Sequence, residues 1–442
     1  MIGKLQRISL YISFLAVVCM GGMFLAKNDL WQLFMVAAAC FFSVGIGAVS
    51  YLKGYQYTAW IITAVIAALC YPSNFLHWGD LDLRHPWLVL LVIQFVMFGM
   101  GVQMKLKDFS GLKTSFRGVL VGLLCQFSIM PIIGFILTRV FDFEPEIAAG
   151  VILIGACSSG LASNVMVYIA RSNLVLSVTV TAVATLVAPF LTPLLMKVLA
   201  GTLVEIEFVN MMIQIIKIVL VPIGAALLYD HLKNTNHRVL KKMNVIVLIC
   251  FTWLIALPLG LWKFLETHLS DEALQSAEIF GFILSAIVAG AVYYKLTGYF
   301  TGLDRFMPYV SMFGIIYFTA ITTAAGRDNL LRIGPLLFLA SVIHNTLGYI
   351  FGYWFSRALK LDKNSARSMA FEVGLQNGGM ASGLAAVMGK LGTVGLAAAV
   401  FSPWMNISGS LLANYWKRNP VDAKKTVRKP KHKFGILKSF QK

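Results

Sequence analysis

This 442-residue chain has few charged residues, and acidic ones are especially scarce. Asp, Glu, Lys and Arg make up 13% of the sequence, and only 19 residues are Asp or Glu. Soluble domains carry about 25% charged residues, so the composition excludes an ordinary soluble protein and a disordered chain. Hydrophobic residues reach 58%, and the mean hydropathy is +0.78. These values predict an all-α polytopic membrane protein.

The sequence also lacks the patterns of a disulfide framework, a thiolate metal site or a hydrolase. Its 6 cysteines lie in apolar stretches without CxxC spacing, which is typical of small buried residues. Neither HExxH nor GxSxG occurs, and a single carboxylate lies inside the predicted spans away from their ends. General acid and base catalysis would therefore have no second partner, and we do not expect an enzyme.

Apolar stretches recur along the whole chain. A bilayer core about 30 Å thick requires roughly 20 apolar residues per helix, and fourteen segments reach or approach that length. The predicted spans are 8–26, 30–51, 57–72, 87–104, 116–138, 146–169, 174–198, 209–229, 244–263, 277–294, 306–324, 334–356, 368–389 and 391–415.

The basic residues indicate how these spans are oriented. With the N-terminus inside, twenty-eight Lys and Arg residues fall on the cytoplasmic side and eight on the other side, as expected for short cytoplasmic loops. We therefore predict that both termini are cytoplasmic and that the protein lies in the plasma or inner membrane. The basic cluster at 424–433 is interpreted as an anchor on anionic lipid, and no nucleic-acid partner is expected despite the net charge of +18.

One acidic residue lies well inside a predicted span. Glu372 opens the run EVGLQNGGMASG at 372–383. An ionisable group in a bilayer is costly and usually functional, although a position near the cytoplasmic end would let Glu372 reach water. The Asn-Gly-Gly step at 377–379 is a poor helix former. Broken backbone at membrane depth is tolerated only where protein or a water-filled cavity covers it.

A second polar interruption lies at 156–166, around Gly160, Ser163 and Asn164. Packing of small residues between helices is an alternative explanation for this segment taken alone. However, the two interrupted spans are the sixth and the thirteenth, so they cross the bilayer in opposite directions. Two such helices in corresponding halves indicate an inverted-repeat transporter with a midplane binding site.

The polar groups near the two interruptions are mostly oxygen donors. They include Glu372, Ser163, Asn164 and Gln376, the pair Ser177 and Thr181 on one helix face, and the isolated amide Gln126. Hard cations prefer such ligands. A proton relay would need more titratable groups. The one candidate found for it in a span, His344, is interpreted as a hydrogen-bonded interior histidine. Sodium fits this set best.

Several segments resemble the bile acid:sodium symporter (BASS) family. They occur in the family's order over about 94–228 and 306–415, somewhat more than half of the chain. The segments are FGMGVQMKLKDF (98–109), QFSIMP (126–131), ASNVM (162–166), LSVTVTAV (176–183), EVGLQN (372–377) and NISGSLLA (406–413).

The resemblance implies a ten-helix inverted repeat of five plus five helices, with a core domain and a panel domain. Its crossed, discontinuous helices would be 146–169 and 368–389. About four additional helices would make fourteen in total. The implied domains are an N-terminal pair at 1–55, the first repeat with the first helix of the second at 56–230, an inserted pair at 244–300, the rest of the second repeat at 306–416, and a basic tail at 417–442.

The resemblance also implies two sodium ions and a small organic anion as substrate. One ion would bind Ser163, Asn164, Ser177, Thr181 and Glu372. The other would bind Gln126, Glu372, Gln376 and the main-chain carbonyls of Val373 and Leu375. Asn377 and Asn406 match positions that face the substrate. Where the family commonly has Pro-Gly-Gly-Thr, this chain has Ser-Ser-Gly-Leu at 158–161, so Gly160 and Leu161 stand beside the substrate and Leu161 removes a hydroxyl.

The function predicted from these observations is sodium-coupled symport of a small organic anion by alternating access. Two alternatives stay open at this point: a carrier of the same fold that uses protons or exports its solute, and a membrane sensor that does not transport. The sequence identifies neither the solute nor the oligomeric state.

Overall fold

The computed structural model describes residues 2–49 and 52–421, so most of the predicted basic tail, including its cluster at 424–433, lies outside the described residues. Nearly all described residues are helical, as predicted. The first part contains α1 (Ile2–Leu25), α2 (Leu30–Gly45), α3 (Gln56–Cys70), α4 (Pro72–Leu76), β1 (His77–Trp78), β2 (Leu81–Asp82), α5 (Pro86–Gly101), α6 (Gly111–Phe141), α7 (Pro145–Ala156), α8 (Leu161–Ile169), α9 (Leu174–Ala200), α10 (Phe208–Ile215) and α11 (Val221–Lys233). The rest contains α12 (His237–Ala256), α13 (Trp262–His268), α14 (Asp271–Tyr299), α15 (Leu303–Ala325), α16 (Arg327–Ala358), α17 (Lys363–Gly374), α18 (Gly378–Val387) and α19 (Val394–Arg418).

Ten helices in the described ranges are long and apolar enough to cross a membrane. This confirms a polytopic, all-helical membrane protein. Four of the fourteen predicted spans do not meet that length: α3 and α5 are short, and the segments 146–169 and 368–389 are each divided into two helices. β1 and β2 form a small antiparallel hairpin between α4 and α5, with His77 opposite Asp82.

Each of the two divided segments contains a short extended stretch. α7 ends at Ala156 and α8 begins at Leu161, and Gly160 has extended dihedrals (φ −105°, ψ 176°). α17 ends at Gly374, and α18 begins at Gly378 after Asn377 accepts a hydrogen bond from the backbone N–H of Met380 (3.0 Å). The extended stretches are therefore shorter than the predicted interruptions.

Two predicted details differ from the structure. Ser163 and Asn164 lie in the first turn of α8 and not within the break. Gly378 and Gly379 begin α18, because the preceding Asn377 already caps that helix. A Cβ atom on Gly378 would overlap the side chain of Ser402, so glycine here permits close packing of α18 on α19.

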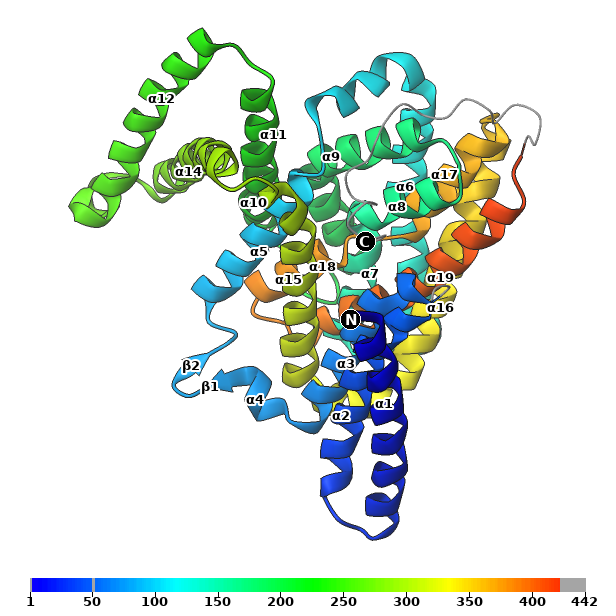
Figure 1. Cartoon of the computed structure of the whole chain (residues 1–442). Helices are drawn as coiled ribbons and strands as arrows, with labels where there is room; N and C mark the ends of the chain where they lie inside the picture. The colour runs from blue at the N-terminus through cyan, green and yellow to red at the C-terminus, as the bar shows by residue number, and fades with distance from the viewer. Residues whose placement is uncertain (1, 50–51, 422–442) are drawn as a thin grey trace.

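The helices form two groups (Figure 1). The first, which we call the core group, comprises α6–α9 and α16–α19, and it contains both breaks. The second, the panel group, comprises α3, α5, α11 and α15, with α15 packed on α3 and α5 and α11 packed on α5. α10 packs on α9 of the core group and leads through a π-helical turn into α11. The remaining helices attach mainly to the panel group: α2 packs on α3, and α14 packs on α11.

An ion pair fixes α14 against the panel group. Between α10 and α11 lies a π-helical turn, Ile216–Leu220, which contains the buried Lys217. The Lys217 ammonium is 2.5 Å from Glu278 Oε2 on α14. In the predicted span 277–294, Glu278 is the second residue. In the structure α14 begins earlier, at Asp271, so Glu278 lies two turns into the helix.

Candidate functional site

The two breaks cross and bond to each other. Ser159, in the first break, forms an antiparallel bridge with Gln376 in the second. The backbone N–H of Asn377 donates to the carbonyl of Ser158 (3.0 Å). These contacts satisfy some of the backbone groups that the helix ends leave free, which is required for irregular backbone inside a protein that spans a membrane.

Glu372 lies at this crossing, on the last turns of α17, and is completely buried. Its carboxylate accepts hydrogen bonds from three hydroxyls: Ser159 (2.6 Å), Thr181 (2.8 Å) and Ser177. Within the described residues, no Lys, Arg or His forms an ion pair with it. A buried carboxylate without a positive partner is costly, so the site favours the arrival of a cation.

The oxygens around Glu372 outnumber the protons available to them. The Oδ1 atom of Asn164 lies 2.8 Å from the Ser177 hydroxyl and 3.4 Å from the Thr181 hydroxyl, both of which also face Glu372. Each hydroxyl has one proton, so neither Ser177 nor Thr181 can donate to Asn164 and to Glu372 at the same time. The surplus of oxygen lone pairs is the environment that a hard cation such as Na⁺ requires.

A second set of oxygens lies beside the first. Gln126 Nε2 on α6 donates to the carbonyl of Cys157 (2.8 Å) and to Gln376 Oε1 (2.8 Å), while Gln376 Nε2 donates to the carbonyl of Val373 (2.6 Å). The Gln126 Oε1 atom is buried, and no described residue donates to it. Unsatisfied buried polar atoms are rare, so this oxygen is available to a ligand.

The structure therefore brings most of the predicted ion ligands together from four helices. Ser177 and Thr181 on α9 contact Glu372, and Asn164 on α8 contacts both of these hydroxyls. The Ser163 hydroxyl donates to the carbonyl of Gly160 (2.7 Å). Gln126, Gln376 and Val373 form the connected set described above, and Leu375 is fully buried in the second break.

The predicted substrate positions are less uniform. Gly160 lies against Asn377, where the two breaks meet, and Asn377 is buried. Leu161, at the first position of α8, is half-buried. Asn406 is also half-buried, and its amide donates to the carbonyl of Ser402 on the same helix (2.8 Å). Ser402 in turn lies beside Gly378, so Asn406 is one helical turn from the second break.

Three residues that hold the breaks were missed from the sequence. Ser159 contacts Glu372 directly, as described above. The carbonyl of Ala156, at the end of α7, accepts a hydrogen bond from Thr192 (2.8 Å), and the carbonyl of Gly374, at the end of α17, accepts one from Asn345 (2.7 Å). Asn345 is an amide inside a predicted span, and Gln126 was identified by that same signal, so the sequence could have indicated Asn345 too. Its neighbour His344 is a buried, hydrogen-bonded histidine, as predicted: Nε2 lies 2.9 Å from the carbonyl of Met130.

Known proteins resemble this chain over most of its length. Residues 90–265 match the model of the Sodium Bile acid symporter family. The "Uncharacterized sodium-dependent transporter YocS" of Bacillus subtilis is 30% identical over 377 residues, which cover 84% of this chain and 94% of that protein. This chain belongs to the Sodium Bile acid symporter family.

Other members show the same relationship at lower identity. The "Probable sodium/metabolite cotransporter BASS1, chloroplastic" of Arabidopsis thaliana is 28% identical over 81% of this chain and 73% of its own length. The human "Ileal sodium/bile acid cotransporter" is 28% identical over 65% of each chain. The family consists of sodium-coupled transporters and not of enzymes, so this protein is a sodium-coupled membrane transporter of a small solute, with Na⁺ as the coupling ion.

Asn345 provides a test of how the second break is held. It accepts a hydrogen bond from Ser408 (2.6 Å) while donating to Gly374. Replacing it with leucine leaves the Gly374 carbonyl without its donor in a buried site, whereas the Ser408 hydroxyl keeps its contacts with Tyr349 (3.0 Å) and the carbonyl of Met405 (3.2 Å). We expect Asn345→Leu to destabilise the protein by about 1–3 kcal/mol. Thermal unfolding of the purified protein measures this loss. Asn414→Leu is the matched control, because the Asn414 amide bonds only within its own helix; equal unfolding temperatures for the two variants would contradict the proposed role.

Proposed function

We propose that the protein is a symporter that uses the sodium gradient to take up a small organic anion by alternating access. The observation that carries this proposal is the buried carboxylate of Glu372, which lies at two crossed helix breaks without a positive partner among the described residues. Ion binding at such a position would order both breaks at once. It would therefore couple the ion to any solute that binds beside them.

One proposed ion binds among the side chains of Ser163, Asn164, Ser177, Thr181 and Glu372. The hydroxyls that now donate to Glu372 would turn their lone pairs toward the ion, and Asn164 would offer its carbonyl oxygen. The contacts between Glu372, Ser177 and Thr181 support this assignment. So do the contacts of Ser177 and Thr181 with both Asn164 and Glu372, because each hydroxyl has only one proton to donate.

A second proposed ion binds Gln126, Gln376, Glu372 and the main-chain carbonyls of Val373 and Leu375. The support is the buried Oε1 atom of Gln126, to which no described residue donates. The carbonyl of Val373 already accepts a hydrogen bond from the side-chain amide of Gln376 (2.6 Å). The Gln376 amide would have to turn so that its oxygen, and not its NH₂ group, faces the ion. Such a turn is a local change that requires no movement of either helix.

The substrate is proposed to bind beside Gly160, Leu161, Asn377 and Asn406. Two Na⁺ ions, the Glu372 carboxylate and a monovalent organic anion add to zero net charge. A neutral set of charges is less costly to enclose in a protein interior than an uncompensated one. The apolar Leu161 would favour a solute with an apolar face at that position.

For the architecture we propose fourteen spans, with both termini in the cytoplasm and the protein in the plasma membrane. Residues 56–230 and 306–416 would form a five-plus-five inverted repeat, and 417–442 would form a basic cytoplasmic tail. The pairs at 1–55 and 244–300 would be additions to the panel group. Their main contacts with α3 and α11 support this, because such contacts leave the core group free to move.

Ligand-dependent thermal unfolding and uptake together test this proposal. Binding to the folded state raises stability by about 2.7 kcal/mol at one hundred times the dissociation constant. We expect NaCl to raise the unfolding temperature above that in KCl of equal ionic strength, and the transported class of organic anion to raise it further only with Na⁺. The same anion should enter proteoliposomes down a Na⁺ gradient. Uptake driven by a pH gradient without sodium, or sodium binding without solute uptake, would contradict the proposal.

A further inference from the structure

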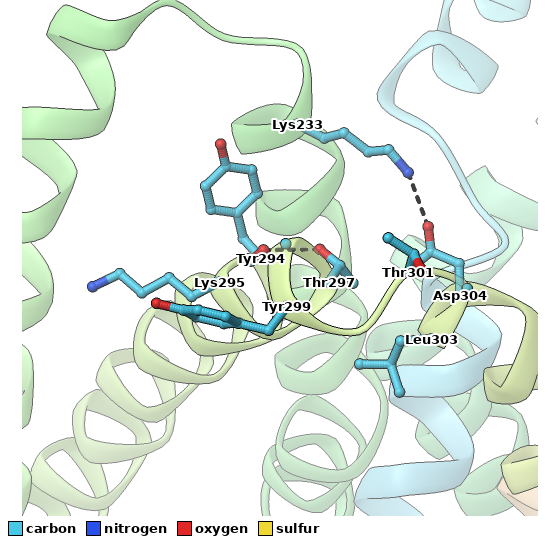
Figure 2. A pocket seen from close by; sticks show the side chains of 10 residues that line it. Lys233, Tyr294, Lys295, Thr297, Tyr299, Thr301, Leu303 and Asp304 are labelled. Carbon is cyan, nitrogen blue, oxygen red and sulfur yellow. Dashed lines mark hydrogen bonds and ion pairs between the residues drawn. The ribbon is translucent and has the colours of Figure 1, made fainter.

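A pocket of about 660 Å³ lies where α11, α14 and α15 end or begin, within the panel group and its attached helix (Figure 2). None of its lining residues belongs to the crossed breaks. Two lysines, two tyrosines and two threonines account for much of its wall: Lys233, Lys295, Tyr294, Tyr299, Thr297 and Thr301. A pocket with several hydroxyl and ammonium donors is suited to an anionic ligand.

One end of the pocket is a fixed, charge-compensated wall. The Lys233 ammonium is 2.9 Å from Asp304 Oδ2, as the dashed line in Figure 2 marks. The hydroxyl of Tyr229 donates to the same carboxylate (2.7 Å), as does that of Tyr293 (3.0 Å). The charge of Lys233 is therefore already neutralised by Asp304, and it is not available to pair with a ligand.

Lys295 carries the uncompensated charge. Its side chain projects from α14 beside that of Tyr299, away from the Lys233–Asp304 pair (Figure 2). In the part of the chain that the structure describes, no acidic side chain forms an ion pair with Lys295. The pocket thus retains a net positive charge at the end that Lys295 and Tyr299 occupy.

The same face of α14 continues as an apolar strip. Val292, Lys295, Leu296 and Tyr299 are spaced i, i+3, i+4 and i+7, so they share one face of the helix. Val292 is 45% exposed, Leu296 40% and Tyr299 82%, whereas Tyr293 on another face is buried. An ammonium group at the end of an exposed apolar strip, beside a tyrosine, is the arrangement expected at the boundary between hydrocarbon and headgroups.

We propose that this pocket binds the phosphodiester headgroup of an anionic phospholipid. Lys295 would pair with the phosphate, the hydroxyl of Tyr299 would donate to its oxygens or to the headgroup, and an acyl chain would lie along Val292 and Leu296. The Thr297 hydroxyl lines the pocket but already donates to the carbonyl of Tyr294 (2.8 Å). In the orientation proposed above, this end of α14 faces the cytoplasmic leaflet, whose anionic lipids attract basic pockets between helices.

The test uses the purified full-length protein in phosphatidylcholine nanodiscs and in detergent. Phosphatidylglycerol, phosphatidylcholine and inorganic phosphate are compared by native mass spectrometry and by thermal unfolding. We expect phosphatidylglycerol to bind and to raise the unfolding temperature, and the other two to do neither at equal concentration. A juxtamembrane lysine contributes about fivefold in affinity, so Lys295→Gln should weaken phosphatidylglycerol binding about fivefold while Lys295→Arg preserves it.

Lys242→Gln is the matched control, because Lys242 is an exposed lysine near the start of α12 and does not line the pocket. It should leave phosphatidylglycerol binding unchanged. An equal loss in Lys242→Gln would show general attraction to anionic lipid and overturn the site. Unchanged binding in Lys295→Gln would overturn it too, as would equal binding of phosphatidylcholine. Equal binding of inorganic phosphate would show a site for a free anion and not for a lipid.

Discussion

Glu372→Gln is expected to abolish sodium-dependent uptake in proteoliposomes. The carboxylate is the only charge at the crossed breaks to which the proposed ions can pair, and its environment is completely buried. Removing one partner of a buried ion pair costs about 3–5 kcal/mol, which corresponds to a loss of at least two orders of magnitude in sodium affinity. The amide also brings N–H groups against hydroxyls that donate to the carboxylate, so the local hydrogen bonds would have to rearrange.

The variant is read out by uptake and by the unfolding temperature in NaCl and in KCl. The expected result is that the difference between the two salts disappears while the protein stays folded in both. Glu266→Gln is the matched control, because Glu266 is exposed on α13 and no described residue forms an ion pair with it. Wild-type uptake with unchanged sodium dependence in Glu372→Gln would show that the ion binds elsewhere.

Much of this site could be predicted from the sequence because polar residues are conspicuous in an apolar span. Glu372, Gln126 and Gln376 each stand out against their neighbours, and lipid tolerates such groups only where protein covers them. The position of the second break followed from the poor helix propensity of Asn-Gly-Gly. The structure moved it by one or two residues, since Asn377 acts as the N-cap of α18.

Other parts could not be predicted, and the reason is physical. Hydroxyls such as Ser159 are common in tightly packed helices of membrane proteins, so only their position beside Glu372 reveals a role. Thr192 and Asn345 donate hydrogen bonds to the carbonyls of residues 36 and 29 positions away in the sequence, and no local sequence pattern predicts these partners. The grouping of helices and the pocket between α11, α14 and α15 likewise depend on packing between distant segments.

The ion pair between Lys217 and Glu278 is such a distant contact, and it has the largest expected effect on stability. Lys217 is 6% exposed, and its ammonium also lies 5.7 Å from the centre of the Phe282 ring. In Glu278→Gln the ammonium loses its counter-charge in an apolar environment. We expect a loss of about 3 kcal/mol, the lower end of the range for a buried pair, because Lys217 is buried but the Glu278 side chain is 40% exposed. The loss is measured as a lower unfolding temperature that is independent of Na⁺. Glu272→Gln, an exposed acid at the start of the same helix, should have little effect.

A double variant separates the cost of an unpaired charge from the value of the pair. Replacing a buried ion pair by apolar side chains of similar size is often neutral or stabilising, because neither charge then has to leave water. Lys217→Met combined with Glu278→Leu should therefore unfold at a temperature near that of the wild type and above that of Glu278→Gln. If the double variant is instead as unstable as Glu278→Gln, the pair itself holds α14 on the π-helical turn. The attachment of α14 to the panel group would then depend on charge, and not on the apolar packing between α11 and α14.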